Sequence, residues 1–382
     1  MQLVRLIPLL CAVAPGVAFA ADPNPFESGQ DQVLAAETDL LTEQAAAAEP
    51  FRLNLYGDVG AGAQSGPGQH PGFGVGAVDL FATADLSDSI RVLSEDVLEV
   101  VDTGAKFELE RLHVDFMLHP WFNVRLGREH IPIGFFSQNY HHAHVFMLSA
   151  TRPTMFNYED EGGILPAHVV GASVFGEGGL GESLSLHYVV GLSNGRGGTA
   201  ADVQSTGDRD LSKAVYGRLS LHPRAVTGME FGASVYLDTL RPADAAPSGT
   251  GGSASPALYD RATETMLGGH LAYQGYPVDA IFEFFHIGHN LHRPAMNLAW
   301  NALTAQVGVE FLEYLTPYAR FDYIHGSRGD PFFVTASTVT ETSKATLGLR
   351  FRLDPKATLK IEGSRDTKND VNAAILEAAF GL

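Results

Sequence analysis

The feature that most constrains the fold is an alternating pattern of apolar and charged residues between Lys106 and Phe136. From position 111 to 116 the even positions are apolar, and the odd positions hold Arg111, His113 and Asp115. A proline at position 120 ends this run, and a second run alternates apolar residues at 122, 124 and 126 with polar ones. Because successive side chains of a strand point to opposite faces, the pattern predicts a β-hairpin with one apolar and one charged face.

Two kinds of fold accommodate such a hairpin. In a soluble sandwich the charged face meets water, whereas in a transmembrane barrel the apolar face meets lipid and the charged face lines the lumen. The composition fits both, with 41 glycines, 10% aromatic residues and a formal net charge of -19. Composition alone therefore leaves the choice open.

The connections between segments favour the barrel. From Phe51 onward the chain divides into about sixteen alternating segments, near 51–63, 73–86, 89–101, 106–118, 121–135, 166–176, 182–193, 212–222, 227–239, 262–275, 278–289, 300–312, 316–328, 338–353, 356–366 and 371–382. Connections after even-numbered segments are short, such as Glu177-Gly178-Gly179 and Tyr314-Leu315, while those after odd-numbered segments are mostly long and polar, such as 136–165 and 288–299. Outer-membrane barrels combine short periplasmic turns with long extracellular loops. The sequence predicts an all-β, antiparallel transmembrane β-barrel over residues 51–382.

The N-terminal region differs from the rest of the chain. Residues 1–20 have one early positive charge, an apolar centre and Ala18-Phe19-Ala20 at the end, which predicts a cleavable signal peptide and export through the periplasm. The only cysteine, Cys11, lies in this segment, so the mature chain is expected to have no thiol. Residues 21–50 carry a weak apolar stripe and are predicted to be a periplasmic tail, either disordered or with a short helix.

The centre of the chain resembles outer-membrane porins of the Gram-negative phosphate-selective porin O/P type. The likeness rests on Gly127-Arg128, Pro132, Gly134-Phe135 and the segment from Gly191 to Gly195. It extends over 51–382 as architecture and is specific only over 106–198. The resemblance implies a passive diffusion channel in the outer membrane, a homotrimer, and a third extracellular loop, here residues 136–165, that folds into the barrel.

Two features depart from that family. The chain ends in Leu382, where such barrels usually end in Phe or Trp, so recognition by the assembly machinery would depend on Phe380 and its apolar stripe. Anion-selective members concentrate lysines and arginines at the constriction, whereas Arg152 is the only basic residue besides histidines in 137–165. The sequence therefore does not predict phosphate selectivity.

Charged residues of both signs are expected on the inner face of the strands. By strand parity the pore-lining residues are Arg52, Arg111, Asp115, Arg125, Glu129, Arg218, Glu283, Arg320, Asp322, Lys344, Arg350, Arg352 and Lys360. Opposed charges create a transverse field that orients polar solutes, or they pair with one another and keep the lumen wet. A slip of one residue in any strand would reverse its assignments.

The loop at 136–165 contains the most distinctive side chains. Its candidate constriction residues are His141, His142, His144, Arg152, Glu159, Asp160 and Glu161. Imidazoles and carboxylates suit zinc, copper or nickel, and titration near neutral pH would make conductance pH-sensitive. The histidines lack a regular ligand spacing, so the preferred interpretation is a polar loop without a metal. We expect its apolar residues to anchor it against the barrel wall, namely Phe146, Met147, Leu148, Met155 and Phe156.

The predicted function is a diffusion porin for small hydrophilic solutes or ions, with outer-membrane lipid as its surroundings and no cofactor. An enzyme is not expected, because no Gly-x-Ser-x-Gly element is present. Nucleic acid is excluded as a partner by the acidic charge and by the lack of a phosphate-binding loop. Two alternatives remain: a non-conducting barrel that serves as a scaffold for a partner protein, and a metal- or pH-responsive channel that uses the histidine loop.

Overall fold

The computed structural model describes residues 50–66, 68–101, 104–140, 144–157, 162–196, 200, 212–242, 259–334 and 339–382. The expected signal peptide and, apart from Pro50, the expected periplasmic tail lie outside these ranges. Within them, no helix is long and apolar enough to span a bilayer.

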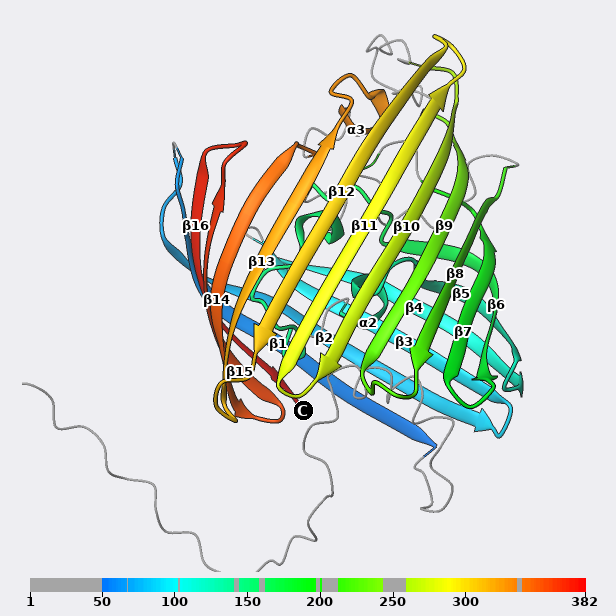
Figure 1. Ribbon diagram of the computed structural model, residues 1–382, viewed down its shortest axis with the longest axis horizontal. Coiled ribbons are helices and arrows are strands. Elements are labelled where there is room, and N and C mark those ends of the chain that lie inside the picture. The colour runs from blue at the N-terminus through cyan, green and yellow to red at the C-terminus, as the bar shows by residue number, and fades with distance from the viewer. Residues whose placement is uncertain are drawn as a thin grey trace, which may run out of the picture.

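Sixteen antiparallel strands of the described residues close into one barrel (Figure 1). They are β1 (Phe51–Gln64), β2 (Gly72–Ser87), β3 (Ile90–Val101), β4 (Gly104–His119), β5 (Phe122–His130), β6 (His168–Leu180), β7 (Leu184–Ser193), β8 (Ala214–Pro223), β9 (Met229–Leu240), β10 (Ala262–Gly275), β11 (Val278–Leu291), β12 (Met296–Val309), β13 (Leu315–Gly326), β14 (Thr342–Asp354), β15 (Ala357–Asp366) and β16 (Val371–Gly381). Each strand pairs with its neighbours in sequence, and β1 pairs with β16 to complete the ring. The predicted fold class is confirmed.

The β4–β5 hairpin shows how the alternation is used. Leu112 and Leu126 are each 46% exposed on the outer surface, while Arg111 and Asp115 are buried inside. Asp115 lies opposite Arg125 in the register of the two strands. A barrel with an apolar outside and a charged inside has the pattern of a membrane-spanning sheet rather than of a soluble sandwich.

The two ends of the barrel differ in their connections. β1 begins and β16 ends at the same end, where the N–H of Leu55 bonds the carbonyl of Leu382 at 3.4 Å. The connections at this end are short, such as 88–89 and 276–277. At the opposite end the connections include 131–167 and 327–341, although 292–295 and 367–370 are brief. We call these the short-turn end and the long-loop end.

Strand β5 is shorter than the sequence predicts, because the chain leaves the sheet after His130 rather than at 135. The N–H of Ile131 still bonds the carbonyl of Ala167 at 3.0 Å, but Pro132 has no N–H to continue the ladder.

Gly127, within β5, has φ +139°, and a Cβ there would lie 2.2 Å from the carbonyl oxygen of Leu112, so this position requires glycine.

Two other predicted connections are wrong. Glu177-Gly178-Gly179 is part of β6 rather than a turn. The glycine at 178 does not mark a turn here, because it leaves room for the indole of Trp121, which a Cβ would overlap. The connection after β11 is 292–295 instead of 288–299, because β12 already begins at Met296. Polar strand residues such as His289 resemble loop residues in the sequence, yet His289 is buried inside the barrel.

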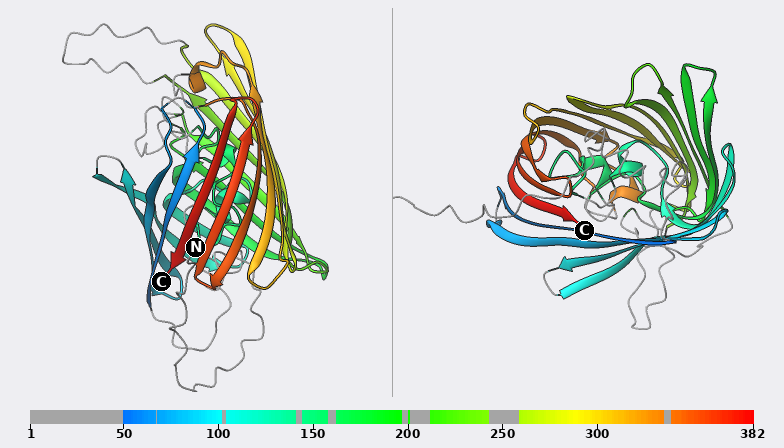
Figure 2. Two further views of the ribbon diagram at one scale, coloured as in Figure 1. Left: turned by 90° about the vertical axis from the view of Figure 1, so that its left-hand side faces the viewer. Right: turned by 90° about the horizontal axis from the view of Figure 1, so that it is seen from below.

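Two short helical elements lie in the segment between β5 and β6, which runs inside the ring of strands (Figure 2). They are α2 (Phe136–Asn139) and the 3-10 turn η1 (Thr154–Phe156), and a third short helix, α3 (Pro331–Val334), follows β13. We call residues 131–167 the inner loop.

The barrel interior contains an apolar core between the inner loop and one wall. It includes Ile131, Ile133, Phe135, Phe136, Met155 and Phe156 from the loop, and Tyr216, Tyr236, Met266, Ile281, Phe285, Ile287 and Trp300 from the wall. These wall residues come from strands β8 to β12. On this side the inward face mixes these apolar residues with buried carboxylates such as Glu264 and Glu283, and the sequence pattern did not predict the apolar part.

Candidate channel lumen and its inner loop

The carboxylate of Glu283 holds the start of the inner loop. Glu283 lies on β11 with 0% exposure, and its two oxygens accept the N–H groups of Phe135 and Phe136 at 2.8 Å each. The neighbouring N–H of Gly134 donates to the hydroxyl of Ser234 at 3.0 Å. A carboxylate is stable in a buried place only when such charge-assisted hydrogen bonds replace its water. This contact ties helix α2 to the wall across the lumen from β5.

Gly134 makes this contact possible. Its φ of +73° is a conformation that residues with a side chain rarely adopt, and a Cβ would lie 2.4 Å from the Oε2 atom of Glu283. Both the backbone conformation and the lack of space for a Cβ therefore require glycine at position 134.

A second carboxylate, Glu362 on β15, holds the far part of the inner loop. It accepts the N–H of Ala150 at 3.0 Å and that of Thr151 at 3.3 Å, and it bonds the Thr151 hydroxyl as well. The hydroxyl of Tyr318 donates to the same carboxylate at 2.9 Å. Glu362 is not among the residues predicted from the sequence, although its strand parity with Lys360 places it inside.

Two cations of the same wall bind the carbonyl side of the loop. Arg320 donates to the Thr151 carbonyl at 2.5 Å and to the Ser149 hydroxyl at 2.6 Å. Lys360, with 0% exposure, donates to the Ser149 carbonyl at 3.2 Å. The loop backbone is thus held by carboxylates at its N–H groups and by cations at its carbonyl groups.

Arg350 acts in the same way, since it donates to the Val145 carbonyl at 3.2 Å. Arg320, Arg350 and Lys360 thus each donate to a carbonyl of the inner loop. The acidic candidates of the constriction, Glu159, Asp160 and Glu161, lie outside the described part of the chain.

Apolar side chains of the inner loop pack on the wall as predicted. The ring of Phe146 meets that of Tyr56 edge-on at 5.5 Å, and Phe156 meets Phe285 at 6.1 Å. Leu148 lies over Gly308, where a Cβ would approach it to 2.7 Å. Met147 and Met155 are each 1% exposed. The expectation that these residues anchor the loop is confirmed.

Strands β1 to β5 carry a row of ion pairs on the inside. Arg52 and Arg91 both pair with Asp85, at 3.6 Å and 2.6 Å. Asp115 pairs with Arg125 at 2.8 Å, and Arg125 continues to Glu129 at 3.1 Å. Water reaches the outer members of this row, since the Arg52 and Asp85 side chains are 38% and 30% exposed. We call this row the β1–β5 ion row.

The remaining expected lumen residues are also paired. The pairs are Arg111 with Glu95 at 2.6 Å, Arg218 with Glu230, Arg320 with Asp322 at 2.9 Å, Lys344 with Asp322 at 3.9 Å, and Arg352 with Glu310 at 3.4 Å. Glu310 lies in the turn after β12, and its partial burial raises its pKa. Arg91 and Glu95 are not among the residues predicted from the sequence, although their alternation on β3 indicates an inward position.

A charged network that the sequence analysis missed lies near the long-loop end. Arg196 bonds Glu264 at 3.0 Å and stacks over the ring of Phe332 at 4.8 Å. Glu264 also meets His289 at 2.8 Å, and His289 bonds Asp330 at 2.7 Å. These residues are far apart in sequence, so no local pattern indicates the network.

The predicted histidine cluster is only partly described. His141 and His142 lie outside the described residues, whereas His144 bonds Glu377 on β16 at 2.9 Å. One ligand atom from each of His144, Glu377 and Asp58 lies within 4.8 Å of the others. Arg152 is buried with 9% exposure.

A pocket of about 330 Å³ opens at the long-loop end. It is lined by Trp300, Arg328, Phe333, Val339, Thr340, Glu341, Lys368 and Asn369. Arg328 bonds Glu341 at 2.9 Å, and this contact holds the pKa of the carboxyl below its ordinary value. The pocket combines an aromatic wall with charges of both signs.

No protein-family model matches the chain, and no curated protein matches it in sequence. Several solved structures are similar to it. An anion-selective porin from Comamonas acidovorans has 12% identity and a TM-score of 0.57, covering 87% of this chain and 100% of that one. OmpT of Vibrio cholerae in its trimer form has 10% identity and a TM-score of 0.56, covering 87% and 100%. The outer membrane channel DcaP of Acinetobacter baumannii has 13% identity and a TM-score of 0.56, covering 90% and 100%. The chain therefore has the barrel fold that these outer-membrane proteins share.

Proposed function

We propose that this protein is an outer-membrane porin that lets small hydrophilic solutes or ions diffuse passively through the barrel. The observation that carries the proposal is the β1–β5 ion row on the inside of a closed barrel whose outside is apolar. An apolar outer surface suits lipid, and ionised groups inside suit a water-filled passage.

The passage runs along the β1–β5 ion row. The opposite side, formed by β8 to β12, is filled by the inner loop and the apolar core, where Glu283 is 0% exposed. On the row side, Arg52 and Asp85 remain partly accessible. We assign the inner loop the role of a fixed constriction that narrows the barrel toward this side.

Selectivity follows from the contacts of the basic residues. Arg320, Arg350 and Lys360 donate to loop carbonyls, so they are engaged in holding the loop. Alternating charges remain along the passage, in which each arginine has a carboxylate beside it. Such a passage favours small dipolar or singly charged solutes, and the residues that the structure describes along it form no concentrated positive site for phosphate.

Liposome swelling tests the proposal. Vesicles that contain the folded barrel are expected to swell in uncharged sugars, at a rate that falls steeply as the sugar becomes larger. Vesicles that contain an equal amount of folded barrel and never swell would instead support a scaffold barrel, the alternative that the filled β8–β12 side favours.

The homotrimer is also part of the proposal. OmpT of Vibrio cholerae is described in a trimer form, and its barrel covers 87% of this chain. Chemical cross-linking of the detergent-solubilised barrel should give a band at three times the monomer mass, while a monomer alone would contradict this assignment. Export is checked by sequencing the mature N-terminus, which should begin at Ala21.

A further inference from the structure

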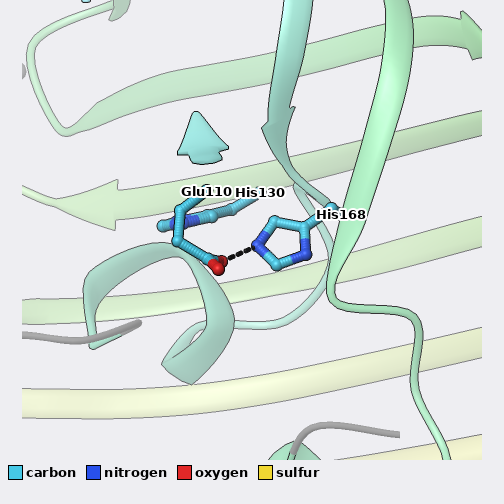
Figure 3. A group of neighbouring side chains, drawn as sticks. All are labelled: Glu110, His130 and His168. Atoms are coloured by element: carbon cyan, nitrogen blue, oxygen red, sulfur yellow. Dashed lines mark ion pairs between the residues drawn. The ribbon is translucent and has the colours of Figure 1, made fainter. Parts of the chain in front are cut away.

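Three side chains from adjacent strands converge at the base of the inner loop (Figure 3). They are Glu110 on β4, His130 on β5 and His168 on β6. One ligand atom of each lies within 4.8 Å of the other two. The side chains are almost fully buried, with exposures of 1% for Glu110, 3% for His130 and 2% for His168.

The strand register brings the two imidazoles together. His130 and His168 are direct partners in the β5–β6 ladder, with ring centroids 5.4 Å apart. The pairing of β3 with β4 shifts between Glu95 and Asp96, so Glu110 is an extra residue at a bulge. A bulge redirects a side chain, and here the Glu110 carboxylate contacts the Nε2 atom of His168 directly.

We propose that Glu110, His130 and His168 form a binding site for a divalent transition-metal ion, with Zn²⁺ as the best match. Two imidazoles and one carboxylate are a common ligand set for this ion. A bound ion would replace the direct contact between the Glu110 carboxylate and the His168 imidazole. Glu95 lies 3.1 Å from the Nε2 atom of His130 and, since its Oε2 atom also pairs with Arg111 at 2.6 Å, it serves as the carboxylate that orients the ring rather than as a ligand.

The position of the site gives it a consequence for the channel. His130 is the last residue of β5 before the inner loop, and His168 is the first residue of β6 after it. An ion that joins them closes the loop at its base and links both ends to β4. Because an ion that binds the folded state alone stabilises that state, the occupied site would hold the base of the constriction.

Surrounding contacts favour this site over the other candidate. In the group of Asp58, His144 and Glu377, the ammonium of Lys360 already pairs with Glu377 at 2.8 Å and would compete with a metal ion. In the Glu110 group, Arg128 donates to the backbone carbonyl of Glu110 at 3.0 Å and so fixes the bulge.

Metal binding to the full barrel, folded in detergent after chelator treatment, tests the inference. Zn²⁺ is expected to bind at one ion per chain, and Co²⁺ should give the absorption of a nitrogen and oxygen site without a thiolate band. In His130→Asn/His168→Asn the affinity should fall by at least about 100-fold, the upper range for changes even to outer partners of a metal ligand. The matched control His286→Ala/His292→Ala removes two exposed histidines and should bind as the wild type does.

Glu110→Gln serves where the double variant does not fold, as judged by heat-modifiable migration. Glutamine keeps a hydrogen bond to His168 but is a poor ligand, so the affinity should again fall. No stoichiometric Zn²⁺ binding by the wild type, or equal affinity in wild type and Glu110→Gln, would overturn the site and leave an ion pair with a purely structural role. Neither result bears on whether the barrel conducts.

Discussion

The Oε2 atom of Glu283 accepts the backbone N–H of Phe135 at 2.8 Å, although the two residues are 148 positions apart in sequence. This bond crosses the barrel from β11 to the start of the inner loop. Together with the contacts of Glu362, it fixes how far the loop reaches into the lumen. The constriction is therefore expected to respond to changes in these two carboxylates.

Replacing Glu283 by alanine should release the start of the inner loop. The N–H groups of Phe135 and Phe136 would then be buried without an acceptor, which costs about 1–3 kcal/mol for each group. Single-channel recordings should show a higher conductance with more open-channel noise. The control Glu182→Ala changes an exposed carboxylate in the short turn between β6 and β7 and should leave both quantities unchanged. Wild-type conductance and noise in Glu283→Ala would contradict the role of this contact.

Gly134→Ala tests the same contact from the loop side. A Cβ would meet the Glu283 carboxylate at 2.4 Å, so the contact must open. Gly68→Ala is a matched control, because Gly68 also has a positive φ, +78°, but has open space around it. The difference in unfolding free energy between the two variants should be about 1–3 kcal/mol, as for a lost buried hydrogen bond. Equal urea midpoints would show that the steric argument is wrong.

Arg52→Glu should change the ion preference of the channel. It places a negative charge beside Asp85 in the β1–β5 ion row, so the reversal potential in a salt gradient should move toward cation selectivity. Arg365→Glu makes the same charge change at a 45% exposed side chain that pairs with Asp370 at the long-loop end. A shift as large in the control as in Arg52→Glu would place the passage elsewhere.

The ion pair between Arg328 and Glu341, in the pocket at the long-loop end, should weaken in acid. Arg328 holds the pKa of Glu341 below its ordinary value of 4.5, so the contact is present at neutral pH and is lost as the pH falls through the lowered pKa. Hydrogen exchange of the segment 327–341 should therefore accelerate in acid. Glu341→Gln should exchange quickly at neutral pH as well. Exchange in the wild type that does not depend on pH, after correction for intrinsic rates, would rule out this coupling.

The sequence predicts the barrel well because lipid selects one face of every strand. Leu112 and Leu126 alternate with charged residues, and this alternation alone places Arg111 and Asp115 inside. Strand ends are harder to predict, since β6 continues through glycines that make room for Trp121, and β11 has a polar residue near its end, His289, that is buried. Alternation fails to predict such positions because packing against a neighbouring side chain, rather than contact with lipid, determines which residue fits there.

The contacts of the lumen and the Glu110, His130 and His168 group are harder to predict from the sequence than the barrel. Parity identifies charged residues with inward positions, but it does not indicate that Glu283 and Lys360 bind loop backbone. The His130–His168 pair depends on a register that only the folded sheet defines. Contacts between residues more than a hundred positions apart leave no periodic signal in a single sequence.

Single-channel recording of the wild-type barrel in a planar bilayer tests whether the barrel holds a water-filled passage. We expect discrete conductance steps, which become larger and noisier when Glu283 is replaced by alanine. A barrel that is folded by heat-modifiable migration and inserts into the bilayer, yet passes no current in either form, would contradict a water-filled passage along the β1–β5 ion row.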